Sequence, residues 1–397
     1  MIIIDKPFVS NFLIETIKQN NFPVISTQNA REIISDNSLN WISEEDATKR
    51  YIKNPQTPIY TNSENSISWI EQNFKNSKLP SQLDVYKDKI KFRELLKDNY
   101  PNYFFQGVKF DELENLKFDG VKFPFIIKPS VGFFSIAVHK VDSISDWGNI
   151  VSKIQNEVKI YQDLYPKEVI NTSEFIIEEY FEGEEYAIDC YFNHEGKPII
   201  LNILHHVFSS ENDVSDRIYS TSKNIFEKYY NGILEFLKII QLKTNLQNFP
   251  THIEVRIDDL GNINPIEVNP LRFGGWCTTG DLSWFAFGFN SYEYFLNGKE
   301  PNWNNIFKSR INKKYSIIVL DNNSGIDGKD IISFDYEKLL KDFSKPLDLR
   351  KADYKVFPVF GFVFVETKID NDDELNKIIT SNLCKYITEN FESASYE

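Results

Sequence analysis

The sequence has few cysteines and no motif that pairs them. Its 397 residues include only Cys190, Cys277 and Cys384, which lie far apart and form no CxxC pair. Disulfide frameworks and structural zinc sites need several cysteines at short, regular spacings. We therefore expect neither kind of site, and the reducing cytoplasm is the expected compartment.

Long apolar runs and a surplus of positive charge are also missing. No uncharged apolar stretch approaches the ~20 residues of a membrane helix, and Asp5 and Lys6 interrupt the start before a signal-peptide core could form. The net charge of −14 disfavours a nucleic-acid backbone as the main partner. We expect a soluble, cytoplasmic protein without membrane or nucleic-acid partners, in which a local basic pocket for a small anion is still allowed.

Several familiar functional motifs are absent as well. The start of the chain predicts a small α/β region, with strands near 2–4 and 23–27 and a helix near 10–19, but it lacks the GxGxxG of a dinucleotide site. The sequence has no GxxxxGK[ST] phosphate loop and no obvious Ser/His/Asp or Cys/His set. The sequence therefore predicts neither of these nucleotide sites and no covalent nucleophile.

What is present indicates a globular protein of about two or three domains, because a chain of this length exceeds one hydrophobic core. Hydrophobic residues make up 41% and charged residues 26% of the sequence, as in ordinary globular proteins. Apolar periodicity predicts helices near 86–105, 144–165 and 224–242. Strand–loop–strand units are predicted at 121–141 and 175–192, and further strands at 315–320 and 356–366.

The segment HIEVRIDDLGNINPIEVNP (252–270) predicts a β-hairpin with one apolar and one polar face. A two-residue turn at Leu260 and Gly261 would place Glu254 opposite Glu267, with Asn269 on the same face. A loop with an odd number of residues would separate the two carboxylates. Facing like charges destabilise a sheet, so this pairing would favour a bound cation.

Two carboxylates and an amide oxygen form the incomplete, oxygen-only ligand set typical of Mg²⁺ that shares its coordination shell with phosphates. An amphipathic hairpin with a hydrated polar face explains the same pattern. The hairpin alone does not decide between these interpretations.

Two other segments carry charges beside apolar strands. Lys128 ends the apolar strand of FPFIIKPSVG, and a buried ammonium group needs an anion; a surface lysine beside a turn is the alternative. In IIEEYFEGEEYAIDC, two apolar strands flank a Glu-rich corner with Gly183. Taken alone, that corner is typical of a solvated turn.

Taken in order, five segments resemble the ATP-grasp superfamily of ATP-dependent carboxylate–amine ligases. They are KDKIKFRELL, FIIKPSVG, IIEEYFEGEEYAIDC, HIEVRID and IEVNPLRFGG, within about 86–290. The resemblance implies an α+β ATP-grasp fold, in which two subdomains grip ATP. A small α/β domain (1–85) would precede the ATP-grasp domain (86–303, with a flap subdomain near 105–175), and a C-terminal α/β subdomain (304–397) would follow it.

The resemblance also implies which residues form the site. The nucleotide would contact Lys89 and Lys128 through its phosphates, Glu178, Glu179 and Phe181 through adenine, and Glu185 through the ribose hydroxyls. The metal ligands would be Glu254, Glu267 and Asn269. The substrate would lie near Arg217, Arg272, Gly274 and Gly275, with Arg272 and Lys128 as catalytic residues.

The implied cofactors are ATP and Mg²⁺, with Mn²⁺ as a substitute, and the partners are a small-molecule carboxylate and an amine. Phosphoryl transfer from ATP would turn the carboxylate into an acyl phosphate, which the amine attacks, releasing ADP and phosphate. The protein would supply positioning and charge stabilisation. Two other functions stay open: carboxylation or thioester formation through an acyl phosphate, and ATP binding without catalysis. A homo-oligomer is compatible with all three.

The resemblance implies that the polar segment 209–223 borders the acceptor pocket, as this part of the chain does in the similar ligases. A long loop in a compact domain is often functional, and a guanidinium can grip a carboxylate with two hydrogen bonds. We therefore expect Arg217 to orient a substrate carboxylate. An ion pair of Arg217 with Asp213 or Asp216 on a solvated loop is the alternative.

Overall fold

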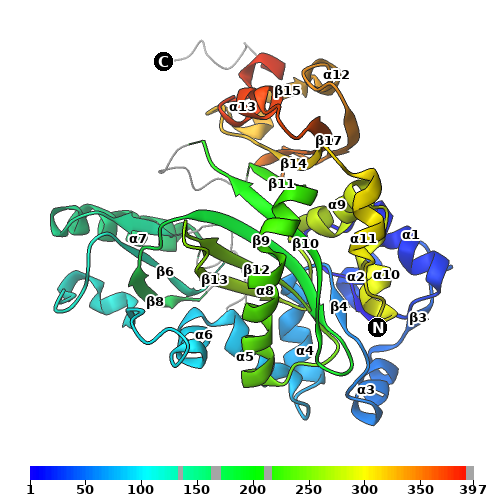
Figure 1. The fold of residues 1–397 in the computed structure, drawn as a ribbon, viewed down its shortest axis with the longest axis horizontal. Helices are drawn as coiled ribbons and strands as arrows, with labels where there is room; N and C mark the ends of the chain where they lie inside the picture. Colours follow the sequence, from blue (N-terminus) through cyan, green and yellow to red (C-terminus); the bar gives the residue numbers. More distant parts are fainter. Residues whose placement is uncertain (133–136, 162–170, 210–216, 390–397) are drawn as a thin grey trace. The chain divides into compact units, whose positions relative to one another are not determined.

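The computed structural model describes residues 1–132, 137–161, 171–209 and 217–389, which form two compact units (Figure 1). The first unit contains residues 1–201, 231–277 and 292–300, and the second contains 202–230, 278–291 and 301–397. This division differs from the three predicted segments. The predicted pre-grasp segment shares a unit with most of the ATP-grasp segment, and residues 304–397 join pieces from the middle of the chain.

The first unit opens with a small α/β region, as the sequence predicts, and its strands form a parallel sheet. Its order is β3-β2-β1-β4, and every pairing in it is parallel. The strands are β1 (Ile2–Ile3), β2 (Val24–Ile25), β3 (Trp41–Ile42) and β4 (Tyr60–Thr61), and the helices between them are α1 (Asn11–Asn20), α2 (Gln28–Ile33) and α3 (Glu44–Lys53).

A group of short helices follows β4. They are η1 (Glu64–Ser66), α4 (Ile67–Asn73), α5 (Leu79–Lys87) and α6 (Lys89–Leu96). The helix predicted near 86–105 is confirmed in part: α6 contains its periodic apolar residues, but it begins only after Asp88. The backbone of Asp88 is extended, and its carboxylate caps α6 by accepting hydrogen bonds from the N–H groups of Ile90 and Lys91. The interruption at Asp88 puts Lys87 at the end of one helix and Lys89 at the start of the next.

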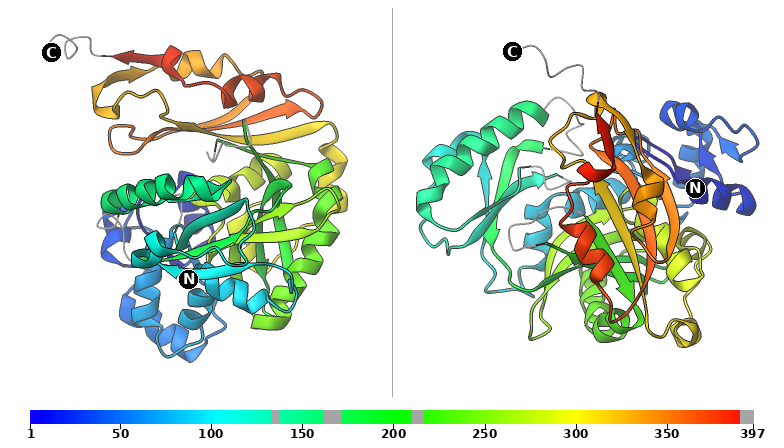
Figure 2. Two further views of the ribbon diagram at one scale, coloured as in Figure 1. Left: turned by 90° about the vertical axis from the view of Figure 1, so that its left-hand side faces the viewer. Right: turned by 90° about the horizontal axis from the view of Figure 1, so that it is seen from above.

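An antiparallel four-stranded sheet and one long helix form the next layer. The sheet order is β5-β8-β6-β7, with β5 (Phe105–Lys109), β6 (Phe125–Val131), β7 (His139–Val141) and β8 (Asn171–Glu179). Helix α7 (Trp147–Tyr161) covers one face of it (Figure 2). The apolar stripe of Ile150, Ile154 and Val158 shares a buried cluster with Phe125 and Phe175.

Strand β9 (Glu184–Phe192) follows β8 directly but belongs to another sheet, so the predicted 175–192 unit links two sheets. The turn between them needs a glycine. Gly183 has a φ of +104°, and a Cβ there would lie 2.3 Å from the carbonyl oxygen of Ile257. The second sheet of this unit has the order β13-β12-β9-β10, with β12 (Phe249–Ile257), β13 (Ile263–Pro270) and the start of β10 (Pro198–Val207).

The hairpin of β12 and β13 has the predicted pairing but not the predicted turn. Glu254 lies opposite Glu267. Residues 258–262 connect the strands, an odd number that alone would separate the carboxylates. A β-bulge restores the pairing: Val255 pairs with Pro265, so Ile266 is skipped and the register shifts by one residue.

The second unit is built around the antiparallel order β10-β11-β14-β17-β16. Its strands are β11 (Ile218–Ser222), β14 (Lys313–Asp321), β16 (Pro346–Lys351) and β17 (Val359–Lys368), with a separate pair of β15 (Ile331–Phe334) and β18 (Ile387–Glu389). Its helices include α9 (Thr278–Phe287), α11 (Trp303–Ile306), α12 (Tyr336–Leu340) and α13 (Asp373–Ile379). A buried cluster including Ile318, Phe360 and Leu383 forms its core.

Two helices, α8 (Lys223–Thr244) and α10 (Ser291–Leu296), contribute residues to both units. On α8, the side chains of Ile233, Leu237 and Ile240 are buried at a spacing that places them on one face. Within the part of the chain that the structure describes, no helix combines the length and apolarity needed to cross a membrane.

Candidate active site

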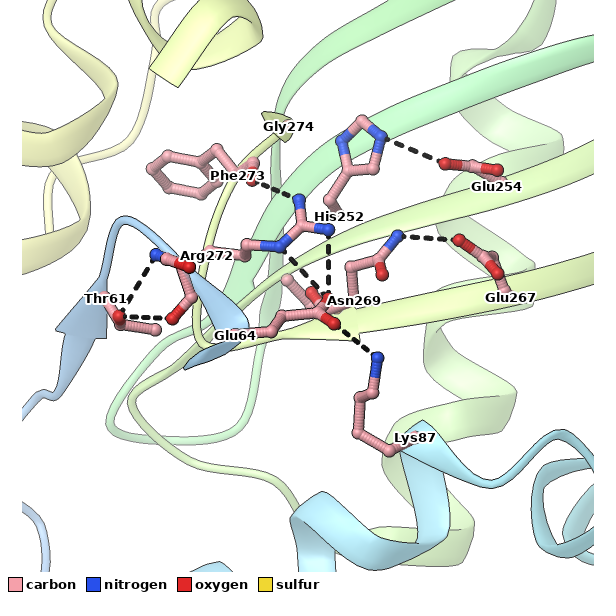
Figure 3. A network of polar contacts seen from close by, with 12 residues as sticks. Thr61, Glu64, Lys87, His252, Glu254, Glu267, Asn269, Arg272, Phe273 and Gly274 are labelled. Atoms are coloured by element: carbon pink, nitrogen blue, oxygen red, sulfur yellow. Dashed lines mark hydrogen bonds and ion pairs between the residues drawn. The ribbon is translucent and has the colours of Figure 1, made fainter. Parts of the chain in front are cut away.

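The polar face of the β12–β13 hairpin carries two facing carboxylates (Figure 3). The side chains of Glu254 and Glu267 are 21% and 19% exposed, so each is largely shielded from water. Burial and the neighbouring Glu267 raise the pKa of Glu254. Burial also opposes ionisation of Glu267, but Lys89, Lys87 and Lys128 outweigh it and hold its pKa at about 2.

Lys89 and Asn269 converge on the same carboxylate. The Nζ of Lys89 lies 3.0 Å from Glu267 Oε2 and donates to the carbonyl of Gly132 at 3.3 Å. The amide of Asn269 donates to the other Glu267 oxygen at 3.1 Å. The structure thus brings the three predicted metal ligands and one predicted phosphate lysine to one place.

Lys128 occupies a second buried charge cluster. Its Nζ lies 2.6 Å from Glu178 Oε1, while Arg93 Nε and the Tyr103 hydroxyl donate to Glu178 Oε2 at 2.9 and 2.5 Å. Burial lowers the pKa of Lys128, and Glu178 counteracts this only in part. Burial opposes ionisation of Glu178 too, but Arg93 and Lys128 lower its pKa to about 2. The Glu178 side chain therefore anchors two cations.

The predicted adenine and ribose residues lie along the β8–β9 connection. The N–H of Glu179 donates to the carbonyl of Phe104, and the ring of Phe181 stacks on Tyr103 at 4.6 Å. Arg256 connects the predicted adenine residue Phe181 with the predicted ribose residue Glu185. Its guanidinium donates to the Phe181 carbonyl at 3.0 Å and to Glu185 at 3.4 Å. Phe181 and Glu185 are thus held by one arginine.

Arg272 contacts a residue from the N-terminal region (Figure 3). Its Nη2 lies 2.9 Å from Glu64 Oε1, and Nη1 donates to the carbonyl of Phe273 at 2.9 Å. Glu64 is buried and also forms a close ion pair with Lys87. Burial opposes the ionisation of Glu64, but Lys87 and Arg272 outweigh it and lower its pKa. One carboxylate therefore holds the catalytic candidate Arg272 and a buried lysine.

The loop after Arg272 carries the two predicted substrate glycines. The N–H of Gly274 donates to Asp189 Oδ1 at 3.2 Å. Gly275 is exposed, and a Cβ added there would meet no heavy atom within 4 Å. The same Asp189 oxygen contacts His252 Nδ1 at 2.7 Å. Burial would lower the pKa of His252, but the hydrogen bond to Asp189 and the nearby carboxylate of Glu254 raise it to about 9.

These residues suit a magnesium-bound nucleotide. Two facing carboxylates and an amide oxygen supply hard oxygen ligands. Burial first and the facing Glu267 second raise the pKa of Glu254, and a divalent cation would offset both effects. Buried Lys89 and Lys128 supply positive charge for phosphates. The residues present therefore fit MgATP.

Comparison with known families agrees with this geometry. Residues 121–280 match the family model of the ATP-grasp domain. This part of the chain is an ATP-grasp domain. A comparison with curated protein sequences found no match.

Solved structures share the ATP-grasp fold over nearly the whole chain. An L-amino acid ligase from Bacillus licheniformis superposes with a TM-score of 0.67 and 16% identity, covering 98% of both chains. N5-carboxyaminoimidazole ribonucleotide synthetase from Thermotoga maritima superposes with a TM-score of 0.62 and 16% identity, also covering 98% of both chains. Biotin carboxylase from Campylobacter jejuni superposes with a TM-score of 0.62 and 12% identity, covering 95% of this chain and 89% of the carboxylase chain. At these identities the likeness establishes the fold.

The sequence did not predict several residues of this candidate site: Glu64, Lys87, Arg93, Tyr103, Asp189 and His252. Asp189 left a signal, because it is the single charged residue within the apolar run YAIDCYF and a buried carboxylate needs partners. Glu64 left none, since it lies in the polar stretch TNSENS, which reads as an ordinary turn.

Arg217 belongs to the second unit and has structural partners there. Its side chain is 2% exposed, and its Nε donates to Asp321 at 2.6 Å. Its Nη1 donates to the carbonyls of Ile378 and Ser381. Asp213 and Asp216, the alternative partners, lie outside the described residues. These contacts favour a structural role for Arg217 over the expected grip on a substrate carboxylate.

We therefore expect Arg217→Ala to destabilise the protein without changing the KM for ATP. The free energy of unfolding should fall by at least about 2 kcal/mol. Loss of one partner of a fully buried ion pair costs roughly 3–5 kcal/mol. We expect less here because Asp321 is 29% exposed. Chemical denaturation measures this loss, with the exposed Lys355→Ala in the same unit as control. A variant with normal stability and a raised KM for the acid substrate would restore the substrate role.

Proposed function

We propose that this ATP-grasp protein is an ADP-forming carboxylate–amine ligase that activates a small-molecule carboxylate as an acyl phosphate. The observation that carries the proposal is the meeting of Glu254, Glu267 and Asn269 with the buried Lys89 on one hairpin face. Binding of ATP without catalysis would not need a further cation, the partly buried Arg272, in addition to this set. We place the reaction in the cytoplasm, where ATP and free amino acids are available.

Each group has a role in this reaction. Glu254, Glu267 and Asn269 would hold the magnesium ion that accompanies ATP, and Lys89 and Lys128 would neutralise the phosphates. The bound ion would supply charge stabilisation to the transferred phosphoryl group. Arg272 would stabilise the charge that develops as the acyl phosphate forms and breaks down. The lysines act by position and charge, and they form no covalent intermediate.

Amino acids are the first substrate class to test. The L-amino acid ligase from Bacillus licheniformis matches this chain over 98% of both lengths, and amino acids offer both a carboxylate and an amine. The structures of biotin carboxylase and of N5-carboxyaminoimidazole ribonucleotide synthetase make carboxylation the second candidate, so bicarbonate belongs in the same experiment.

The test is ATP-dependent product formation. The purified protein is incubated with MgATP and pools of amino acids and small acids, phosphate release is followed, and products are identified by mass spectrometry. We expect phosphate, ADP and an amide product only when both an acid and an amine are present. Phosphate release that requires bicarbonate would favour carboxylation. ATP binding without phosphate release in any pool would show a non-catalytic protein.

A further inference from the structure

One buried carboxylate connects two parts of the proposed site. Asp189 on β9 lies opposite His252 on β12, and the two side chains are fully and almost fully buried. Asp189 Oδ1 contacts His252 Nδ1 at 2.7 Å and accepts a hydrogen bond from the N–H of Gly274 at 3.2 Å. A single carboxylate oxygen of Asp189 thereby holds both the imidazole ring of His252 on β12 and the loop that follows Arg272.

The ring of His252 extends this connection to the predicted metal ligand. Its Nε2 lies 3.6 Å from Glu254 Oε1 (Figure 3). Because Nδ1 contacts Asp189, each ring nitrogen faces a carboxylate oxygen. Glu254 is two residues further along the same strand, and alternation puts both side chains on the hairpin's polar face. Contacts therefore run from Asp189 through His252 to Glu254.

Fold stability alone is a poor explanation for this arrangement. Asp189 Oδ2 is buried and has no hydrogen-bond partner among the residues that the structure describes. An unsatisfied buried polar atom costs about 1–3 kcal/mol, and such atoms in native proteins call for an explanation. A neutral apolar pair at 189 and 252 would avoid that cost. The pair is better explained by what it holds in place.

We propose that Asp189 and His252 are a buried positioning pair, which orients Glu254 for metal binding and fixes the Gly274 loop for the substrate. This inference rests on the proposed MgATP site. Carboxylates that bind metals are themselves oriented by hydrogen-bonding partners, and loss of such a partner typically costs about 10–100-fold in metal affinity. Neither Asp189 nor His252 would touch the metal.

The sharpest test separates the two contacts of the ring. In His252→Asn the side-chain amide can still reach Asp189, as Nδ1 does, but it is too short to reach Glu254. In His252→Gln the longer amide can restore a donor near the position of Nε2. Asp189→Asn keeps the size of the side chain and removes its charge. Cys190→Ala is the matched control, because Cys190 is equally buried next to Asp189 on the opposite face of β9.

Binding of Mn²⁺ is measured by electron paramagnetic resonance with a non-hydrolysable ATP analogue, beside thermal unfolding without metal. We expect about a tenfold or greater rise in the Mn²⁺ dissociation constant for His252→Asn and Asp189→Asn, partial recovery in His252→Gln and wild-type behaviour in the control. Folded His252→Asn protein with unchanged Mn²⁺ affinity would overturn the inference while leaving the ligase proposal intact. Wild-type protein that binds no Mn²⁺ with the analogue would refute the MgATP site and this inference with it.

Discussion

Replacing Glu267 with alanine should abolish ATP turnover, with a loss of at least about a thousandfold. Glu267 faces Glu254, accepts a hydrogen bond from Asn269 and lies 3.0 Å from Lys89. Its removal takes one of two carboxylates from the proposed metal site and leaves Lys89 without its counter-charge. Metal ions contribute several kcal/mol of transition-state stabilisation, and about 4 kcal/mol corresponds to a thousandfold in rate.

The measurement combines steady-state phosphate release with calorimetric titration of MgATP. Glu182→Ala is a suitable control because Glu182 is an exposed carboxylate on the β8–β9 turn of the same unit. Equal MgATP affinity and equal turnover in Glu267→Ala and wild-type protein would refute the assignment of Glu267 as a metal ligand.

Lys128→Ala should weaken nucleotide binding by about 10–100-fold. A hydrogen bond to a charged group contributes about 1.5–3 kcal/mol, and each 1.4 kcal/mol is tenfold in affinity. The fold should survive the change, because Glu178 keeps Arg93 and Tyr103 as partners. The low pKa of Glu178 keeps that carboxylate ionised and ready to hold Lys128 against the phosphates.

Calorimetry with an ATP analogue compares this variant with Lys153→Ala, which removes an exposed lysine from α7. Lys153 is a better control than Lys140, because Lys140 pairs with Asp142 and lies over the Tyr180 ring. If Lys128→Ala and Lys153→Ala bind nucleotide equally well, Lys128 serves only the buried ion cluster.

The sequence predicted those parts of the site that depend on short-range pattern. The hairpin pattern predicted Glu254 opposite Glu267 on the condition of an even connection; the pairing is confirmed, but a bulge produces it across an odd connection. The apolar strand before Lys128 left a buried ammonium and a surface lysine open, and the structure has the buried one. Strand alternation is fixed within a few residues, whereas the bulge that sets the register has no such local pattern.

The partners that cross the fold could not be predicted in this way. Glu64 and Arg272 are 208 residues apart, and Arg93 is 173 residues from the Ile266 carbonyl to which it donates. Such pairs depend on how separate elements pack, and the sequence around Glu64 or Arg93 has no pattern that indicates the partner. The same reason explains Arg217, which looked like a loop arginine until the strand β14 supplied Asp321.

The bulge at Ile266 limits which insertions and deletions this hairpin can accept. The carbonyl of Ile266 accepts a hydrogen bond from Arg93 at 2.8 Å, so a residue of helix α6 anchors the bulge. With the bulge fixed, a change of one residue within 258–262 would turn Glu254 and Glu267 to opposite faces. Changes of two residues would keep them together. Homologues and engineered variants that retain this anchor should therefore differ in turn length by even numbers, a parity rule that can be read from sequence alone.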